Sequence, residues 1–326
     1  MITLSEISKI AGVSISTVSR VLSEDETLKV TDEIRNKIIK IADENQYKRK
    51  RKKSKNLNEY EEVMILKNYD EETEIEDAYY YYLRTKLENK LKKNNIKIVV
   101  ERYSKKINLK KNNILIGSYP EKILSDLSKK RCNLILCDSY SDKENIDCVT
   151  FNFKNSVYKV LDYIINRGHS NIGFIGGKDS EEKQDFREKY FTKYMKKFNM
   201  YKKENIYIEN FDFKTGYNKT KEILSLEEYP TALFVATDEI ALGCYKAAKE
   251  FNKKIPEDIS IIGFNNLDMS EYMIPPLTSV QVYMDNIINE TINLLKERMI
   301  HNKNYTKKIL LETKIIERDS VKQLLL

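Results

Sequence analysis

The chain has 326 residues, of which 41% are hydrophobic and 33% are charged, and its formal net charge is +7. This length allows two or three domains with sizeable cores, and the composition excludes a disordered chain. No apolar run approaches the roughly 18 residues of a membrane helix, and the first residues are too polar for a signal peptide, so we expect a cytoplasmic protein without membrane contact.

The first predicted elements belong to a small helical head. Thr3 is a candidate N-cap for a first helix, since Leu4, Ile7 and Ile10 follow it at helical spacing. Gly12 can adopt the positive φ that ends such a helix. A turn of three residues then leads to the next apolar pattern.

A second helix is predicted after this turn, because Val18, Val21 and Leu22 share one face. The opposite face presents Ile15, Ser16, Ser19 and Arg20. A third amphipathic segment over residues 31–46 closes the core of the head. Its apolar side chains are Ile34, Ile38, Ile41 and Ala42. Helix, glycine-containing turn and helix form the helix-turn-helix layout, whose second helix enters the DNA major groove. The first 47 residues are therefore predicted to bind DNA.

A basic run follows the head. Residues 1–55 contain 13 Lys and Arg residues against 8 Asp and Glu residues, which is +5 of the total +7. Seven of the eight residues from 48 to 55 are basic. Such a run is commonly a solvated linker, but its place after a helix-turn-helix favours a clamp on DNA phosphates. The residues of this clamp would be Lys48, Arg49, Lys50, Arg51, Lys52 and Lys53.

From residue 61 onwards, short apolar runs alternate with amphipathic segments. The runs cover residues 62–66, 96–100, 114–117, 134–138, 149–151, 172–176, 206–208, 232–237, 259–264 and 309–312. The helices predicted between them cover residues 82–92, 157–166, 187–198, 217–224, 240–251 and 284–299. Runs without polar alternation indicate parallel strands covered on both faces, and the length indicates two doubly wound lobes. Ligands of such sheets bind beyond the carboxyl ends of the strands, so we expect a cleft between the lobes.

Five stretches carry a family resemblance. They are A-G-V-S-I-S-T-V-S-R-V-L at 11–22, R-G-H-S-N-I-G-F-I-G-G at 167–177, A-T-D-E-I-A-L-G at 236–243, P-E-D-I-S-I-I-G-F-N-N at 256–266 and P-P-L-T-S-V at 275–280. The chain resembles the lactose/galactose repressor (LacI/GalR) family of bacterial transcription regulators over essentially its whole length. The loop at 23–30 is similar to that of the galactoside-type subgroup.

The resemblance implies a fold and a domain order. An all-α helix-turn-helix head would occupy residues 1–47, and a basic linker or hinge would occupy residues 48–60. Residues 61–326 would form an effector-binding and dimerisation domain. That domain would be α/β and similar to the periplasmic binding proteins, with two doubly wound parallel-sheet lobes.

The resemblance also implies roles in the head. Arg20 matches the residue that reaches a guanine edge, with a phosphate contact as the alternative. Ile15 and Ser16 match the positions that set operator preference. Thr3, Thr17 and Ser19 are expected at phosphates, and Ser14 is a further candidate DNA contact. The family's hinge motif Y-x-P-N-x-x-A-R-x-L is not kept after residue 47, which makes a minor-groove wedge by the displaced Leu57 the less favoured outcome.

An effector site is implied in the long domain. Arg187 in R-E-K-Y-F matches the arginine of R-x-x-G-F that hydrogen-bonds the ligand, although Tyr190 replaces the glycine. Asn265 stands where many relatives use Asp to hold sugar hydroxyls, and Thr237 replaces a common Asn. The other candidates are Asp138, Phe211 and Asp238. For Asp138 and Phe211 a structural role is an equal interpretation, and Asp238 could cap the next helix instead.

Motifs for catalysis, cofactor binding and metal binding are missing from the sequence. It contains no G-x-S-x-G, Walker A or G-x-G-x-x-G pattern. The cysteines lack ligand spacing, so reduced buried thiols are expected. His169 is expected to make a structural hydrogen bond, and Gly176 and Gly177 are expected at a sharp turn where a strand ends. We therefore expect no enzyme activity, no cofactor and no metal site.

Together with these patterns, the resemblance implies a homodimeric, sequence-specific regulator that binds a pseudo-palindromic operator in double-stranded DNA. It would repress carbohydrate-utilisation genes until a sugar, with a galactoside as one candidate, releases it. The alternative is a small-molecule-binding module that responds to a sugar phosphate or a purine, or one with degenerate operator specificity.

Overall fold

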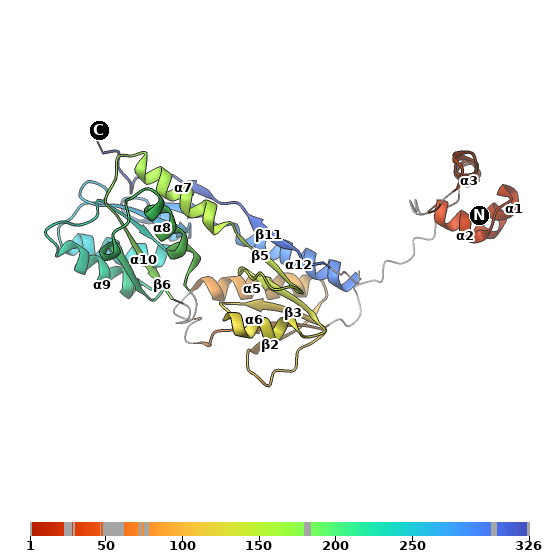
Figure 1. Cartoon of the computed structure of the whole chain (residues 1–326), viewed down its shortest axis with the longest axis horizontal. Helices are drawn as coiled ribbons and strands as arrows, with labels where there is room; N and C mark the ends of the chain where they lie inside the picture. Colours follow the sequence, from red (N-terminus) through yellow and green to blue (C-terminus); the bar gives the residue numbers. More distant parts are fainter. Residues whose placement is uncertain are drawn as a thin grey trace. The chain divides into compact units, whose positions relative to one another are not determined.

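The computed structural model describes residues 2–22, 28, 30–45, 47, 62–71, 74, 78–178, 184–300 and 305–324. The chain divides into two compact units, which we call the head (Met1–Asn56) and the two-lobed unit (Leu57–Leu326) (Figure 1). The predicted basic linker and most of the loop at 23–30 lie outside the described residues.

Three helices form the described part of the head: α1 (Leu4–Ala11), α2 (Ile15–Val21) and α3 (Asp32–Glu44). The predicted N-cap Thr3 is confirmed, because its Oγ1 accepts a hydrogen bond from the amide of Glu6 at 3.3 Å. In return, Glu6 Oε2 accepts one from the amide of Thr3 at 2.8 Å. This capping box satisfies two amides that helix geometry leaves without partners. Gly12 ends α1 at a φ of 73°, as predicted.

One apolar core holds these helices together. Ile7 from α1, Val18 from α2 and Ile38 from α3 are fully buried. Because the inward face of α2 is committed to this core, its opposite face must turn outward. The predicted amphipathic pattern of the head is therefore confirmed.

The first lobe of the two-lobed unit is a parallel sheet with strand order β11-β5-β4-β3-β1-β2. Its strands are β1 (Glu62–Lys67), β2 (Lys97–Arg102), β3 (Asn112–Ile116), β4 (Asn133–Cys137), β5 (Ile146–Phe151) and β11 (Lys308–Leu311). Helices α5 (Ala78–Lys93) and α12 (Met284–Ile300) pack together over one face, and α6 (Glu121–Ser128) packs over the other. Successive residues of β1 enter opposite cores, Ile65 on the α5 side and Leu66 on the α6 side. A strand buried on both faces shows the continuous apolar run that the sequence displays.

The second lobe has the strand order β12-β10-β9-β8-β6-β7. Its strands are β6 (Ile172–Gly177), β7 (Ile206–Glu209), β8 (Ala232–Val235), β9 (Ser260–Asn265), β10 (Thr278–Gln281) and β12 (Lys314–Ile316). Its helices are α7 (Phe153–Ile165), α8 (Phe186–Lys197), α9 (Phe213–Leu224), α10 (Asp238–Glu250) and the short α11 (Met269–Tyr272). The prediction of parallel strands is confirmed except at one edge, where β12 pairs antiparallel with β10.

The chain passes between the lobes at three places: from β5 to α7, from β10 to α12, and from β11 to β12. Side chains join the first and third passages. Glu312 accepts hydrogen bonds from Asn152 Nδ2 at 2.8 Å and Lys159 Nζ at 3.1 Å. Connections of this kind allow two lobes to rotate about short segments while each sheet stays intact.

Two further features of the second lobe were expected from the sequence. Gly176 and Gly177 are the last two residues of β6, so they end a strand as the sequence predicts. A Cβ on Gly177 would lie 2.6 Å from the backbone nitrogen of Phe211, so glycine is required by a close approach of backbone. His169 is structural as predicted, since its Nδ1 pairs with Thr231 Oγ1 at 2.9 Å.

Candidate functional sites

The outward face of α2 brings several predicted DNA contacts together. Its exposed members are Ile15, Ser16, Ser19 and Arg20. Ser14 caps the helix, since its Oγ accepts a hydrogen bond from the amide of Thr17 at 3.1 Å. Ile15 keeps 49% of its surface exposed and takes no part in the head core. This face is therefore available to another molecule.

The remaining DNA-contact candidates in the head differ in exposure and in hydrogen bonding. Thr3 is exposed, but its hydroxyl also donates to Glu6 Oε2 at 2.8 Å within the capping box. Thr17 is half-buried, and its hydroxyl shares a hydrogen bond of 2.8 Å with Ser14 Oγ. The basic residues 48–53 lie outside the described residues.

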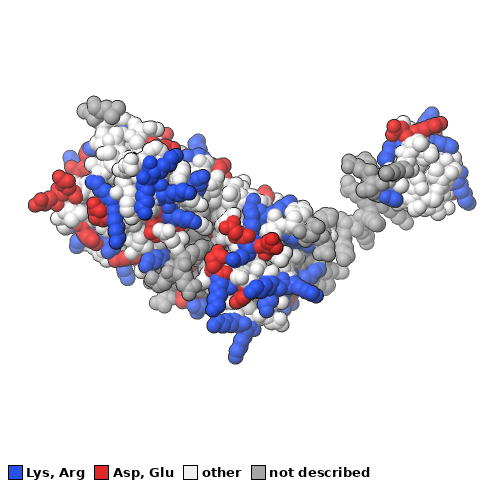
Figure 2. Space-filling view, in the orientation of Figure 1, with Lys and Arg blue, Asp and Glu red and all other residues white. Residues whose placement is uncertain are grey.

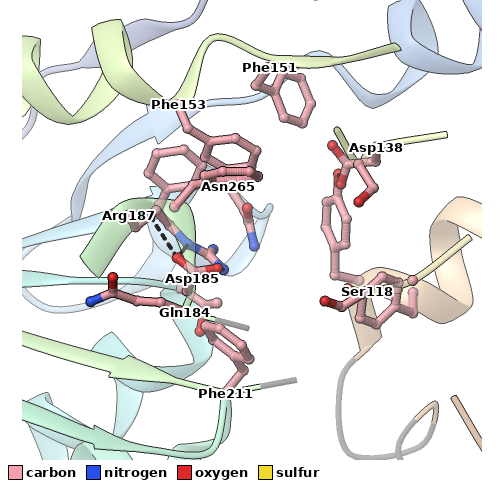
Figure 3. Close-up of a pocket in the computed structure, with 16 residues that line it drawn as sticks. Ser118, Asp138, Phe151, Phe153, Gln184, Asp185, Arg187, Phe211 and Asn265 are labelled. Atoms are coloured by element: carbon pink, nitrogen blue, oxygen red, sulfur yellow. Dashed lines mark hydrogen bonds and ion pairs between the residues drawn. The ribbon is translucent and has the colours of Figure 1, made fainter. Parts of the chain in front are cut away.

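A cavity lies between the lobes of the two-lobed unit (Figure 3). The first lobe lines it with Tyr79, Tyr80, Gly117, Ser118, Asp138, Ser139 and Phe151. The second lobe lines it with Phe153, Gln184, Asp185, Phe186, Arg187, Phe211, Thr237, Phe264 and Asn265. Many of these residues end or follow a strand of one sheet or the other, because the carboxyl ends of both sheets face the same gap. The cleft predicted between the lobes is therefore present.

Arg187 is held in the second-lobe wall by several contacts. Its Nε and Nη2 donate to the two carboxylate oxygens of Asp185 at 2.8 and 2.9 Å, and its Nη1 donates to the carbonyl oxygen of Ala236 at 2.7 Å. The guanidinium carbon lies 4.7 Å from the ring centre of Phe211 and 5.5 Å from that of Phe264. A bidentate carboxylate and two aromatic rings hold the cation in one geometry.

Asp138 occupies the opposite wall, as Figure 3 shows. Its Oδ2 accepts a hydrogen bond from the hydroxyl of Tyr79 at 2.7 Å. Burial and the nearby Asp138 carboxylate raise the pKa of Tyr79 well above its usual value, so the phenol stays a donor. The backbone of Asp138 has a φ of 59°, and Asn265 across the cavity has a φ of 104°. Aspartate and asparagine adopt a positive φ more readily than other non-glycine residues, so these two positions suit the residues that occupy them.

Asp238 corrects the sequence analysis twice. It does not cap α10, because Thr237 Oγ1 accepts the amide of Ile240 at 3.2 Å and takes that role. It also does not line the cavity, since it is fully buried behind it. Its carboxylate instead accepts hydrogen bonds from the amide of Leu267 and the hydroxyls of Ser270 and Ser279, at 2.7, 2.8 and 2.7 Å. Asp238 thereby fixes the loop that follows Asn265.

The other predicted effector residues meet in the cavity. Asp138, Arg187, Phe211, Thr237 and Asn265 all line it, although they are far apart in the sequence. Sequence reasoning missed Asp185 and most of the aromatic lining. For Asp185 a signal existed, because an aspartate directly before a predicted helix is a preferred N-cap, and its Oδ1 accepts the amide of Arg187 at 2.8 Å. For the aromatic residues no local pattern separates lining from core.

The described part of the chain carries neither a membrane-spanning helix nor a cluster of metal-binding side chains. None of the helices in it is long and apolar enough to cross a membrane. Those residues also include no group of three or more His, Cys, Asp and Glu side chains that could hold a metal ion.

Two protein families match the chain, each over a different part of it. Residues 3–50 match the bacterial regulatory proteins of the lacI family, and residues 161–321 match the periplasmic binding protein-like domain. Among curated proteins, the HTH-type transcriptional regulator GalR of Streptococcus thermophilus is 32% identical over 331 residues, covering 99% of this chain and all of the relative. The regulator GanR of Bacillus subtilis (strain 168) is 28% identical over 98% of this chain and all of the relative.

Solved structures show the same fold. A complex of the transcriptional regulator CelR with cellobiose superimposes with a TM-score of 0.69 at 18% identity, covering 98% of this chain and all of that chain. The lac repressor dimer bound to operator and the anti-inducer ONPF gives a TM-score of 0.68 at 18% identity, covering 98% of this chain and 99% of that chain.

Proposed function

The chain belongs to the lacI family of bacterial transcription regulators, and we propose that it is a homodimeric repressor of carbohydrate-utilisation genes that a neutral sugar releases from its operator. The cavity carries this proposal. It combines aromatic rings with hydroxyl, amide and carboxylate groups, which is the chemistry that binds a sugar through its apolar faces and its hydroxyls.

In the proposed complex with DNA, the head reads the operator through α2. Arg20 would contact a guanine, while Ile15 and Ser16 would lie over neighbouring bases. Ser14, Thr17, Ser19 and Thr3, with the basic residues 48–53, would contact phosphates. Two heads related by a two-fold axis would read the two halves of a pseudo-palindrome. This activity belongs in the cytoplasm, where bacterial operator DNA lies.

The proposed effector is neutral because the charges lining the described part of the cavity leave no uncompensated cation. The charge of Arg187 is balanced by Asp185, and Asp138 adds a second carboxylate on the other wall. A phosphate would therefore meet two carboxylates and one neutralised arginine. A sugar hydroxyl can instead donate to Asp138 and exchange hydrogen bonds with the amide of Asn265.

The proposed coupling runs through the three passages between the lobes. A ligand held by Asp138 on one wall and by Asn265 on the other favours one rotation of the lobes over others. Because the first lobe directly follows the linker to the head, that rotation would change the separation of the two linkers in the dimer. The relatives are regulators rather than enzymes, and we propose that the ligand leaves chemically unchanged.

The test is operator release. An operator is selected from randomised duplexes, and its anisotropy with the full chain is titrated with neutral sugars, the matching sugar phosphates and purines. We expect neutral sugars to release the operator and sugar phosphates and purines to leave it bound. Release by a sugar phosphate or purine alone would replace the proposed effector class.

The matched variants are Arg187→Ala and Arg167→Ala. Arg167 is also paired with a carboxylate, Glu317, but it does not line the cavity. We expect Arg187→Ala to bind the operator normally and to lose the response to sugar, and Arg167→Ala to keep both. Loss of operator binding in a folded Arg187→Ala variant would assign Arg187 to the dimer or lobe geometry instead.

A further inference from the structure

A groove adjoins the cavity and continues it outward. The two hollows share four lining residues: Phe151, Phe153, Gln184 and Phe186. The groove also reaches Tyr140 and Thr150 in the first lobe and Tyr190 on α8. A ligand that contacts only the cavity would leave this groove empty. The residue that departs from the R-x-x-G-F pattern, Tyr190, lies in the groove and not in the cavity.

Aromatic rings run through both hollows. Phe264 in the cavity lies parallel to Phe153 with ring centres 6.0 Å apart and planes at 14°. Phe153 continues to Phe186 at 5.8 Å and 27°, and Phe186 continues to Tyr190 at 6.2 Å and 18°. Nearly parallel rings at this separation are offset, so each leaves part of its face uncovered by the next. Tyr140 meets Phe186 edge-on at 6.5 Å.

Polar groups accompany these rings. Thr150 is 2% exposed, and its Oγ1 has no hydrogen-bond partner among the described residues. A buried hydroxyl without a partner is unfavourable, so it marks a place that a ligand's hydrogen-bonding group can complete. The hydroxyl of Tyr140 donates to Asp142 Oδ1 at 2.7 Å at the same groove. Lys189 lies 5.9 Å from the ring centre of Tyr190, so the groove holds both signs of charge.

We propose that the groove is a second sugar subsite, and that the effector is a neutral oligosaccharide of at least two units. One unit would occupy the cavity, and the next would lie across Phe186 with Tyr190 and Tyr140 beside it and Thr150 Oγ1 bonded to one of its hydroxyls. This inference rests on the proposed function, because it extends the proposed sugar site. Stacking rings with polar groups of both signs suit a neutral ring that has apolar faces and many hydroxyls.

The test compares chain length in the full-length protein. Monosaccharides and the disaccharides and trisaccharides built from them are titrated by calorimetry and by operator release. We expect a disaccharide to bind at least tenfold more tightly than its better-binding monosaccharide unit. This comparison needs no variant and therefore does not depend on how a substitution folds.

Variants locate the second unit. We expect Tyr190→Ala to weaken disaccharide binding about tenfold, to leave monosaccharide binding within twofold, and to be rescued by Tyr190→Phe, which keeps the ring. Tyr217→Ala is the matched control, because Tyr217 stacks on Phe213 outside both hollows.

The outcomes separate the two proposals. Equal affinity for monosaccharide and disaccharide, or equal loss of both in Tyr190→Ala, would overturn the second subsite and leave the sugar effector standing. Failure of every sugar to bind would overturn the proposed function itself.

Discussion

Replacing Asp185 by asparagine isolates the charge that compensates Arg187. Asparagine is as good an N-cap as aspartate, so the hydrogen bond from the amide of Arg187 is kept while the carboxylate is lost. The guanidinium beside Phe211 and Phe264 would then lose its bidentate carboxylate partner. We therefore expect the two-lobed unit of Asp185→Asn to be less stable than that of the natural chain.

The magnitude follows from burial. Arg187 and Asp185 are 12% and 16% exposed and share two contacts below 3 Å. Breaking a fully buried pair by removing one partner costs about 3–5 kcal/mol, and the residual exposure lowers this to about 2–3 kcal/mol. For a unit of this size that corresponds to a fall in Tm of about 4–6 °C. Urea denaturation followed by circular dichroism measures the change.

Two companion measurements complete the experiment. Arg187→Gln in the Asp185→Asn background removes the guanidinium charge and should recover part of the loss. Inorganic phosphate should raise the Tm of Asp185→Asn and leave the natural chain unchanged, since only the variant lacks the carboxylate that occupies Nε and Nη2 of Arg187. The reasoning is refuted if Asp185→Asn is within about 0.5 kcal/mol of the natural chain, or if phosphate stabilises both equally.

Three further substitutions test other parts of the molecule. Arg20→Ala should weaken operator binding by about 1–3 kcal/mol and relax preference at one base of each half-site; equal loss across all operator variants in a competition assay would make Arg20 a phosphate contact. Gly243→Ala places a Cβ 2.1 Å from the carbonyl oxygen of Phe213. The urea midpoint should therefore fall by the equivalent of about 1–3 kcal/mol. An unchanged midpoint would mean that α9 and α10 separate freely. Burial raises the pKa of Asp238 to about 7, although its three hydrogen bonds lower that pKa. Between about pH 4 and pH 7 the folded chain therefore holds a proton that the unfolded chain has released. Stability should fall by about 1.4 kcal/mol per pH unit as the pH rises through this range. Asp238→Asn should remove this part of the pH dependence, and parallel Tm profiles for both chains between pH 5 and 8 would contradict the assignment.

The net charge is distributed unevenly along the chain. Residues 1–55 hold +5 of the total charge of +7. On the visible face of the two-lobed unit, Figure 2 shows basic and acidic side chains interspersed. Sequence-independent attraction to DNA is therefore expected from the head and its basic run rather than from the lobes.

The sequence by itself determined the features that depend on local spacing. The N-cap at Thr3, the positive φ at Gly12 and the inward face of α2 follow from patterns within a few residues, and the structure confirms each. Doubly buried strands also have a local signature, because both of their faces need apolar side chains. Two strands lack this signature: β10 and β12 were missed because their sequences, T-S-V-Q and K-I-I, contain no apolar run like those of the predicted strands.

Only the tertiary structure decided how the cavity is built. Tyr79 meets Asp138 across 59 residues, and Arg187 meets the carbonyl of Ala236 across 49, so no window of sequence contains either contact. The same holds for Asp238, which lies in a cavity motif by sequence but is buried behind the wall. Its three donors come from Leu267 after β9, Ser270 on α11 and Ser279 on β10. Periodicity tells which face of an element is buried, and the contacts between distant strand ends decide which buried groups meet a ligand.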